Sequence, residues 1–224
     1  MKKTVYTYYQ KIDELDEEYQ KEILSICEES WRNKGWEFKV LSEKNVENSD
    51  SYSEFKKTIL SYPTVNNYLY EYSCYMRWLA MAEIGGGILI DYDVFNLDLD
   101  SQDEEFFNHT GLTIYVENCP CVVSGSKEDY LSAVRFFTSL HKDVQTTIPD
   151  KDLYSKNFLK SIKDKPHTSD MYMICSGRIK LNKVNKVKNY PDIGKLIHCS
   201  NYNCLYKKLK LKKEVMSEFK NYKL

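Results

Sequence analysis

The order of apolar and polar positions predicts strands that alternate with helices at the start of the chain. Residues 4–8 (TVYTY) are a short β-rich run, expected to be the first strand. Apolar side chains then recur at helical spacing over residues 16–31, and Gly35 supplies a stop signal. Apolar and charged side chains alternate in residues 36–40 (WEFKV), which is typical of a half-buried strand. The chain therefore opens with a strand, a helix and a second strand.

The same patterns predict elements along the rest of the chain. A polar loop with a short helix is expected over residues 45–61, and a second strong helical pattern follows Pro63 and leads to the glycines at 85–87. Residues 88–90 are an apolar run that indicates a buried strand. Later strands are expected in LTIYV (112–116), CVVSGS (121–126), MYMICSG (171–177) and KLIHCS (195–200), and later helices near 130–140 and 151–163.

Alternating strands and helices predict an α/β fold with a mostly parallel central sheet flanked by helices. The chain has no internal repeat and no linker rich in glycine, serine or proline, so we expect a single domain over residues 1–224. Residues 205–224 are expected to form a lysine-rich amphipathic helix with a solvated face. The alternative is a face that contacts anionic lipid or a phosphorylated acceptor. In sheets of this kind, ligands bind beyond the carboxyl ends of the strands.

Composition narrows the classes of partner and location. With 32 Lys+Arg and 33 Asp+Glu, the net charge is -1, so no nucleic-acid partner is expected. No stretch has the roughly 18 to 20 apolar residues of a membrane span, so no transmembrane segment is expected. The 7 cysteines and an N-terminus without the apolar core of a signal peptide indicate a reduced, cytoplasmic setting. Cys119 and Cys121 lack two further ligands at zinc-site spacing, which favours buried thiols.

The residues that are most informative about function lie in residues 84–97 (IGGGILIDYDVFNL). The three glycines indicate a turn that lets two backbone segments pass closely. Because side chains alternate along a strand, Asp91 and Asp93 are expected on one side and Tyr92 on the other. Two carboxylates at the end of a buried strand favour a bound cation, such as Mg²⁺ or Mn²⁺ with a phosphate-bearing ligand. The alternative is a pair of exposed loop aspartates that merely ends the strand.

Residues 73–94 (SCYMRWLAMAEIGGGILIDYDV) resemble the sugar-binding region of glycosyltransferases of the GT-A type. That region has the pattern S-D-x-x-R, a helical spacer, G-G, a short apolar run and D-x-D. Similar segments occur in the initiating mannosyltransferase-like DXD family, in the glucosyltransferase domains of large clostridial toxins and in small algal-virus capsid glycosyltransferases. The resemblance implies a Rossmann-like GT-A fold. The sequence departs from the pattern at Cys74, where the family has aspartate, and at Leu89, where tyrosine or tryptophan is common.

The resemblance also implies a metal site and a donor site. Mn²⁺ or Mg²⁺ would be held by Asp93 and Asp91, and His198 matches a late histidine that contacts the metal or diphosphate in several such enzymes. Arg77 matches the arginine that contacts the donor sugar, and its guanidinium can fork to sugar hydroxyls or to a carboxylate of the pair. The other donor-site positions that the resemblance implies are Ser73, Gly86, Gly87, Tyr6, Thr7 and Tyr8.

The predicted function is transfer of a hexose or deoxyhexose from a UDP- or GDP-sugar to a hydroxyl of a glycan or glycoprotein acceptor. Asp91 and Asp170 are the expected catalytic residues, and Glu117 is a further candidate for the base that takes the acceptor proton. One alternative is a phosphatase of the haloacid dehalogenase type, with Asp91 as nucleophile and Asp93 as general acid, although its motif normally opens the chain. The other alternative is a non-catalytic sugar-binding domain. Cys74 is compatible with it, because the family has aspartate at this position.

Overall fold

The computed structural model describes most of the first 139 residues and three short later segments. The described residues are 3–13, 17–103, 106–108, 110–116, 119–139, 167–175, 185–186 and 196–198. The helices predicted at 151–163 and 205–224 lie outside these residues, as does Glu117. Among the described helices, none has both the length and the apolar character needed to cross a bilayer.

The main sheet of the described residues has six strands in the order β2-β1-β3-β6-β5-β7. Pairing is parallel in β1–β2, β1–β3 and β5–β7, and antiparallel in β3–β6 and β5–β6, so parallel pairs predominate. A second, two-stranded sheet pairs β4 with β8 in antiparallel fashion. The strands are β1 Thr4–Tyr8, β2 Glu37–Leu41, β3 Gly86–Ile90, β4 Val94–Asn96, β5 Thr113–Val116, β6 Cys119–Ser126, β7 Asn185–Lys186 and β8 Leu196–His198.

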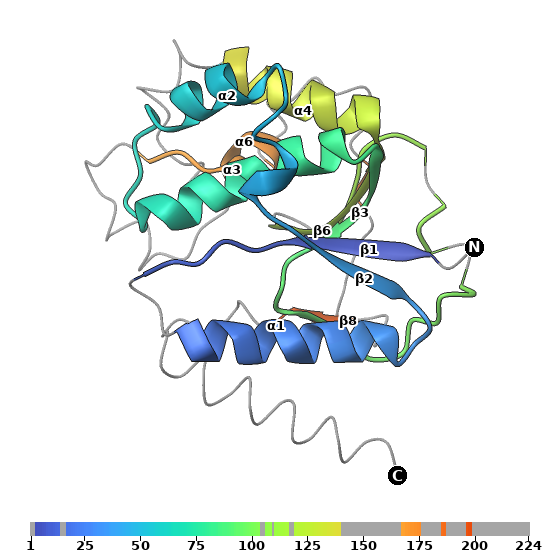
Figure 1. Ribbon diagram of the computed structural model, residues 1–224. Helices are drawn as coiled ribbons and strands as arrows, with labels where there is room; N and C mark the ends of the chain where they lie inside the picture. The colour runs from blue at the N-terminus through green and yellow to red at the C-terminus, as the bar shows by residue number, and fades with distance from the viewer. Residues whose placement is uncertain are drawn as a thin grey trace, which may run out of the picture.

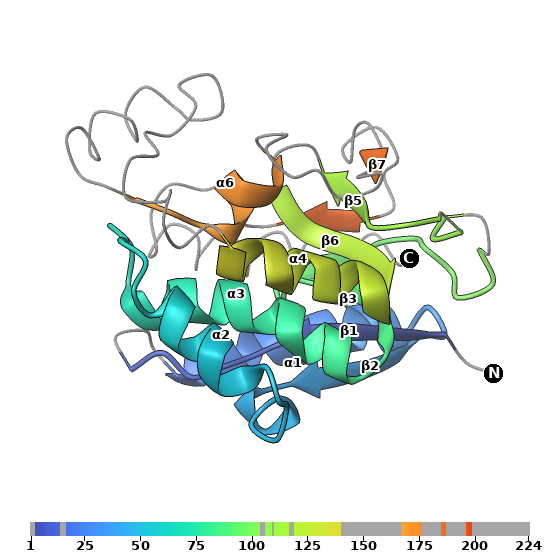
Figure 2. The same ribbon diagram turned by 90° about the horizontal axis from the view of Figure 1, so that it is seen from above.

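Helices cover both faces of the main sheet (Figure 1). On one face α1 lies beside the small β4–β8 sheet, and on the other face lie α2, α3, α4 and α6. Seen from above, α2, α3 and α4 lie side by side over the strands (Figure 2). The helices are α1 Glu17–Arg32, α2 Tyr52–Ile59, α3 Tyr68–Glu83, α4 Lys127–Ser139 and α6 Asp170–Cys175, with a 3-10 helix at Glu43–Asn45.

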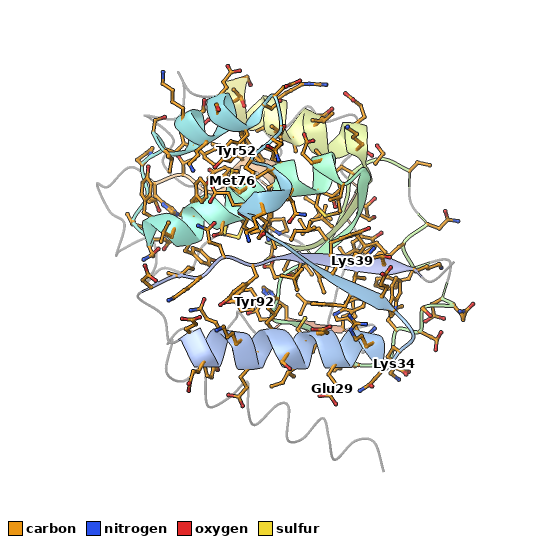
Figure 3. All side chains as sticks on the ribbon, viewed as in Figure 1. Glu29, Lys34, Lys39, Tyr52, Met76 and Tyr92 are labelled. Carbon is orange, nitrogen blue, oxygen red and sulfur yellow. The ribbon has the colours of Figure 1, made fainter. Side chains whose placement is uncertain are left out.

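The helical layers enclose one apolar cluster on each face of the sheet. The α1 cluster, named for the helix that covers it, is centred on Trp31 and Trp36, whose rings pack edge to face at 5.5 Å. In the α3 cluster on the other face, Trp78 packs against Phe137 of α4 at 5.8 Å. Figure 3 shows Met76 of the α3 cluster within the layer of helices. The last residues of β1, β2 and β3, which are Tyr8, Leu41 and Ile90, belong to these clusters.

The glycine run that joins α3 to β3 has positive φ angles of 98°, 88° and 127° at Gly85, Gly86 and Gly87. A Cβ atom on Gly86 would lie 2.6 Å from both the carbonyl oxygen of Gly125 and the amide nitrogen of Lys127. The predicted close passage of two backbone segments is therefore confirmed. It fixes the start of β3 against the end of β6, and so helps to position the aspartates that follow β3.

Two predictions of local structure are wrong. Residues 171–177 are predicted as a strand, but Asp170–Cys175 forms α6. A short apolar run does not distinguish a strand from a buried helix, and packing against the α3 cluster decides the outcome here. Val40 is predicted on a buried face but is 43% exposed. β2 is the edge strand of the sheet, and its last residue, Leu41, packs into the α3 cluster instead.

Candidate metal and donor site

The aspartate pair lies at the carboxyl end of β3, as predicted. The strand ends at Ile90, and the amide of Val94 donates a hydrogen bond to the carbonyl of Asp91 at 3.0 Å. Asp91 and Asp93 therefore belong to a turn rather than to a continuing strand. The amide of Asp91 donates to the carbonyl of Cys121 at 2.8 Å, which ties this turn to the start of β6.

His198, the last residue of β8, faces the two aspartates. It lies opposite Val94 in the β4–β8 ladder. The imidazole Nε2 atom lies 3.3 Å from Oδ1 of Asp93 and 3.7 Å from Oδ2 of Asp91. The candidate ligand atoms of the three residues all lie within 4.8 Å of one another. The structure thus brings together the three residues that the sequence nominates for a metal site.

This donor set fits a divalent metal ion. Carboxylate oxygens suit Mg²⁺ and Mn²⁺, whereas imidazole is a common ligand of transition metals, so the combination favours Mn²⁺. The side chains of His198 and Asp93 are 7% and 12% exposed, and that of Asp91 is 28% exposed. A shielded site of this kind strengthens electrostatic interactions with any ion that enters it.

The neighbours of Asp91 and of His198 shift the pKa values at this site. Burial raises the pKa of Asp91 to about 6, against the opposing effects of Arg77 and His198. Burial by itself would lower the pKa of His198, but Asp93 and Cys119 together outweigh it and raise that pKa to about 10. A metal ion that uses the imidazole must therefore displace a proton that Asp93 and Cys119 stabilise.

Arg77 connects the aspartate pair to a third carboxylate. It lies on α3, which is buried between the sheet and neighbouring helices, and is 7% exposed. Its Nη1 donates to Asp91, its Nη2 donates to Oδ2 of Asp170 at 2.6 Å, and its Nε donates to the Cys74 carbonyl at 3.1 Å. Of the two contacts expected for this guanidinium, the one with the aspartate pair is present. Contact with a donor sugar stays a prediction.

Asp170, a predicted catalytic residue, begins α6 and is 2% exposed. Its Oδ2 atom accepts hydrogen bonds from Arg77 and from Nε1 of Trp78 at 2.8 Å, and its Oδ1 atom accepts from the amide of Met171 at 2.7 Å. Donors therefore contact both oxygens. These contacts favour a role in orienting Arg77, and the role of Asp170 as a catalytic acid or base stays a prediction.

The remaining predicted donor-site residues make contacts elsewhere in the described structure. Tyr6 and Tyr8 pack with the α3 cluster. Thr7 is 0% exposed, and its Oγ1 atom has no hydrogen-bond partner among the described residues. The hydroxyl of Ser73 donates to the carbonyl of Leu69 within α3. Their roles in binding a nucleotide or sugar stay predictions.

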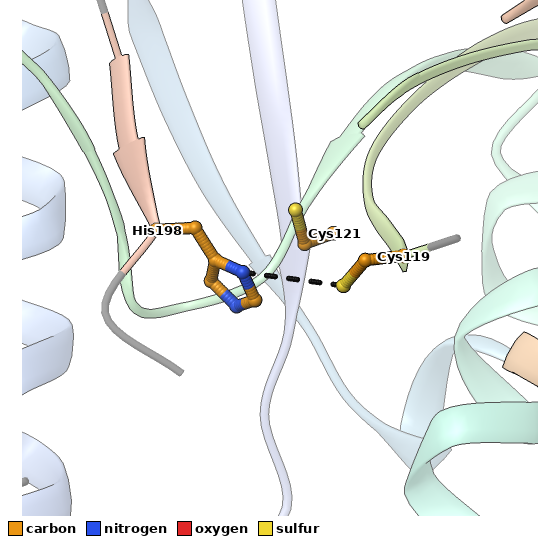
Figure 4. Close-up of side chains that lie close together, drawn as sticks. All are labelled: Cys119, Cys121 and His198. Atoms are coloured by element: carbon orange, nitrogen blue, oxygen red, sulfur yellow. Dashed lines mark hydrogen bonds between the residues drawn. The ribbon is translucent and has the colours of Figure 1, made fainter. Parts of the chain in front are cut away.

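Two thiols also lie beside His198. The sequence analysis did not predict this contact. Cys119 and Cys121 lie at the start of β6, and Sγ of Cys119 is 3.9 Å from Nδ1 of His198 (Figure 4). Cys121 is 0% exposed, as predicted for a buried thiol, whereas Cys119 is half-buried. Cys121 and His198 hold the pKa of the Cys119 thiol well below its usual value, although burial opposes them. The sequence signal was a Cys-Pro-Cys triplet before an apolar strand, but nothing in it indicated the pairing with β3.

Comparisons with known proteins place the chain in a family. The model of a family described as Domain of unknown function (DUF8765) matches residues 1–161. The chain belongs to DUF8765. The matched part of this DUF8765 chain includes Arg77, Asp91 and Asp93, whereas Asp170 and His198 lie beyond it. No curated protein matches the chain.

A solved structure resembles this DUF8765 protein along nearly its whole length. It is described as the crystal structure of a glycosyltransferase involved in the glycosylation of the major capsid of PBCV-1. The likeness covers 96% of this chain and 100% of that chain, with a TM-score of 0.50 and 10% identity. At this identity it bears on the fold alone. The predicted Rossmann-like α/β fold of the GT-A type, with a mostly parallel central sheet flanked by helices, is confirmed.

Proposed function

We propose that this protein is a metal-dependent glycosyltransferase that moves a hexose or deoxyhexose from a UDP- or GDP-sugar to a hydroxyl of a glycan or glycoprotein. The observation that carries the proposal is the convergence of Asp91, Asp93 and His198 at the carboxyl end of β3, with candidate ligand atoms within 4.8 Å of one another. Strand ends of this kind are the ligand-binding edge of α/β sheets. The likeness in fold to a solved glycosyltransferase supports the proposal.

Asp93, Asp91 and His198 would hold the metal ion, for which their donor atoms favour Mn²⁺. When bound, the ion supplies positive charge that neutralises the leaving diphosphate. Without the ion, the site offers a diphosphate little unpaired positive charge, because Arg77 contacts Asp91 and Asp170 and His198 lies beside Asp93. Binding of a nucleoside diphosphate should therefore depend on the metal.

The contacts that hold Arg77 support the proposal that it binds the donor sugar. Asp170 and Asp91 fix its guanidinium from two sides, and Trp78 holds Asp170 in turn. The described contacts leave one N–H on each terminal nitrogen of the guanidinium. A side chain that is already fixed loses little freedom when a substrate binds, so its remaining donors can orient sugar hydroxyls efficiently.

The ion pair between Arg77 and Asp91 argues against a phosphatase of the haloacid dehalogenase type. In that reaction Asp91 would attack phosphorus, and a carboxylate that accepts a hydrogen bond from a buried guanidinium is a weakened nucleophile. A role as a ligand or orienting group is compatible with the pair. We therefore assign Asp91 a role in binding the metal ion and the sugar donor.

Turnover of nucleotide sugars tests the proposal. The purified chain is incubated with a panel of UDP- and GDP-sugars and Mn²⁺, with and without EDTA, and released nucleoside diphosphate is measured. We expect release from at least one donor, abolished by EDTA and restored by added Mn²⁺. Hydrolysis of simple phosphate esters without release of nucleoside diphosphate would indicate a phosphatase. Metal-dependent binding of a donor without turnover would indicate a non-catalytic sugar-binding domain.

A further inference from the structure

A second set of metal-ligating side chains meets at the other nitrogen of His198. The thiols of Cys119 and Cys121 and the imidazole have candidate ligand atoms that all lie within 4.8 Å of one another. Figure 4 shows the two thiols on the side of the ring that carries Nδ1, and Sγ of Cys119 lies 3.9 Å from that atom. The aspartate pair faces Nε2 instead. His198 thus stands between an oxygen-rich and a sulfur-rich set of ligands.

The backbone holds these soft ligands in place. Cys119 and Cys121 lie at alternate positions of β6, on either side of Pro120, so both side chains leave the same face of the strand. β6 pairs with β5 through Cys119 and with the turn after β3 through Cys121, while β8 holds His198 against β4. A site built on paired strands is more rigid than one built on a loop.

We propose that Cys119, Cys121 and Nδ1 of His198 form a binding site for a thiophilic divalent metal ion, of which Zn²⁺ is the natural candidate. Two thiolates and one imidazole are a ligand set that Zn²⁺ uses with a fourth, open position. With Zn–S near 2.3 Å and Zn–N near 2.0 Å, sulfur and nitrogen lie about 3.5 Å apart across a tetrahedron. The distance between Cys119 and His198 is close to this value.

The carboxylate next to the imidazole supports the proposal independently. A histidine that binds zinc through one ring nitrogen usually donates the N–H of the other nitrogen to a carboxylate or carbonyl. If Nδ1 binds zinc, the Nε2 proton of His198 points to Asp93, whose Oδ1 lies 3.3 Å away. Asp93 would then fix the tautomer and orientation of the zinc ligand.

Zinc at this site has a consequence for the aspartate site. A histidine that donates its Nε2 proton to Asp93 is not available as a ligand on the aspartate side. Zn²⁺ should therefore weaken Mn²⁺-dependent binding of a nucleoside diphosphate, a consequence that rests on the proposed function. Binding of zinc itself does not rest on it.

The test measures Zn²⁺ affinity on the reduced, metal-free full chain, by competition with a chromogenic chelator, and the absorption spectrum of the Co²⁺ form. We expect one Zn²⁺ per chain and a thiolate-to-cobalt charge-transfer band. Both should be lost in the double variant Cys119→Ser/Cys121→Ser, with Zn²⁺ affinity reduced at least 100-fold. Cys74→Ser, which removes a thiol outside the set, should bind Zn²⁺ as the parent does.

Because Cys121 is fully buried, its replacement can prevent folding. A second variant that keeps Cys121 is therefore measured as well. Cys119→Ser alone, at the half-buried position, should reduce Zn²⁺ affinity at least tenfold. Asp93→Asn should reduce Zn²⁺ affinity about 10- to 100-fold. This is the usual effect of losing a carboxylate that accepts a hydrogen bond from a metal-binding histidine. Unchanged Zn²⁺ affinity in Cys119→Ser, or a Co²⁺ spectrum without the charge-transfer band, would overturn the proposal. Zinc binding without any Mn²⁺-dependent nucleotide binding would leave this site intact and count against the proposed function alone.

Discussion

Arg77 and Asp170 form a buried ion pair, with Nη2 of the guanidinium 2.6 Å from Oδ2 of the carboxylate and side chains that are 9% and 3% exposed. The pair joins α3 to α6, and through the second terminal nitrogen of Arg77 it reaches Asp91 at the end of β3. Removing one partner of a buried pair leaves the other charge without compensation. The stability of the fold and the geometry of the candidate site are therefore linked at Arg77.

Asp170→Asn should lower the free energy of unfolding by about 3 kcal/mol, because it leaves the buried guanidinium with one carboxylate fewer. Urea unfolding followed by circular dichroism measures this change. Glu128→Gln is the matched control, since the Arg135–Glu128 pair is 65% and 67% exposed and should contribute less than about 1 kcal/mol. Equal effects of the two substitutions would show that the buried pair contributes no more to the free energy of unfolding than the exposed pair does.

Arg77→Lys should lower the turnover of a nucleotide sugar much more than it weakens binding of the free nucleoside diphosphate. Lysine keeps the positive charge but cannot reproduce the forked contacts of the guanidinium with Asp91 and Asp170. Steady-state kinetics and calorimetry on the same preparation provide the comparison. A parallel loss of turnover and of nucleoside diphosphate affinity would reassign Arg77 to the diphosphate.

Gly86→Ala should destabilise the protein more than Gly85→Ala. Both positions have positive φ, which by itself costs a non-glycine residue about 1 to 3 kcal/mol. Only at Gly86 would the new Cβ atom also lie 2.6 Å from backbone atoms, because nothing lies within 4 Å of a Cβ at Gly85. The difference in urea unfolding between the two variants isolates the steric cost. Equal losses would mean that the backbone of β6 can move away from β3.

Glu71 should make stability depend on pH. Burial raises its pKa from 4.5 to about 8, although the hydrogen bond from Asn66 opposes the shift. Because the folded state binds this proton more tightly than the unfolded state does, the stabilisation is complete below pH 4.5 and is lost as pH rises through 8. Each unit of pKa difference corresponds to about 1.4 kcal/mol.

Glu71→Gln is neutral at every pH, so its free energy of unfolding should fall less between pH 5 and pH 8 than that of the parent. The matched control is Glu83→Gln, at the exposed end of the same helix, which should retain the parental pH dependence. Urea unfolding at several pH values measures all three proteins. If Glu71→Gln showed the full parental decline, another group would be responsible for it.

Local sequence patterns are sufficient to predict the part of the site that lies within one continuous segment. The helix of Arg77, the glycine turn and the strand before Asp91 follow one another in the chain, and each has its own signal of periodicity or backbone conformation. The position of the aspartate pair beyond a strand end follows from these signals. Its turn geometry does not, because it depends on the hydrogen bond between Asp91 and Val94.

The part of the site that depends on long-range pairing could not be predicted. Cys121 meets Asp91 only because β6 runs antiparallel to β3 in one particular register, and the alternation of strands and helices predicts parallel neighbours instead. The bond from Trp78 to Asp170 requires α6 to be a helix packed on α3, whereas its short apolar sequence favours a strand. Tertiary packing decides both features.

Calorimetric titration of UDP and GDP with and without Mn²⁺ measures whether Asp91, Asp93 and His198 form a metal-dependent donor site. The parent and Asp93→Asn are compared with Asp98→Asn, which removes a 77% exposed carboxylate from the same segment. We expect Mn²⁺-dependent binding of at least one nucleotide by the parent and by Asp98→Asn, and an affinity at least 100-fold lower for Asp93→Asn. Equal affinity of the parent and Asp93→Asn in the presence of Mn²⁺ would contradict this expectation.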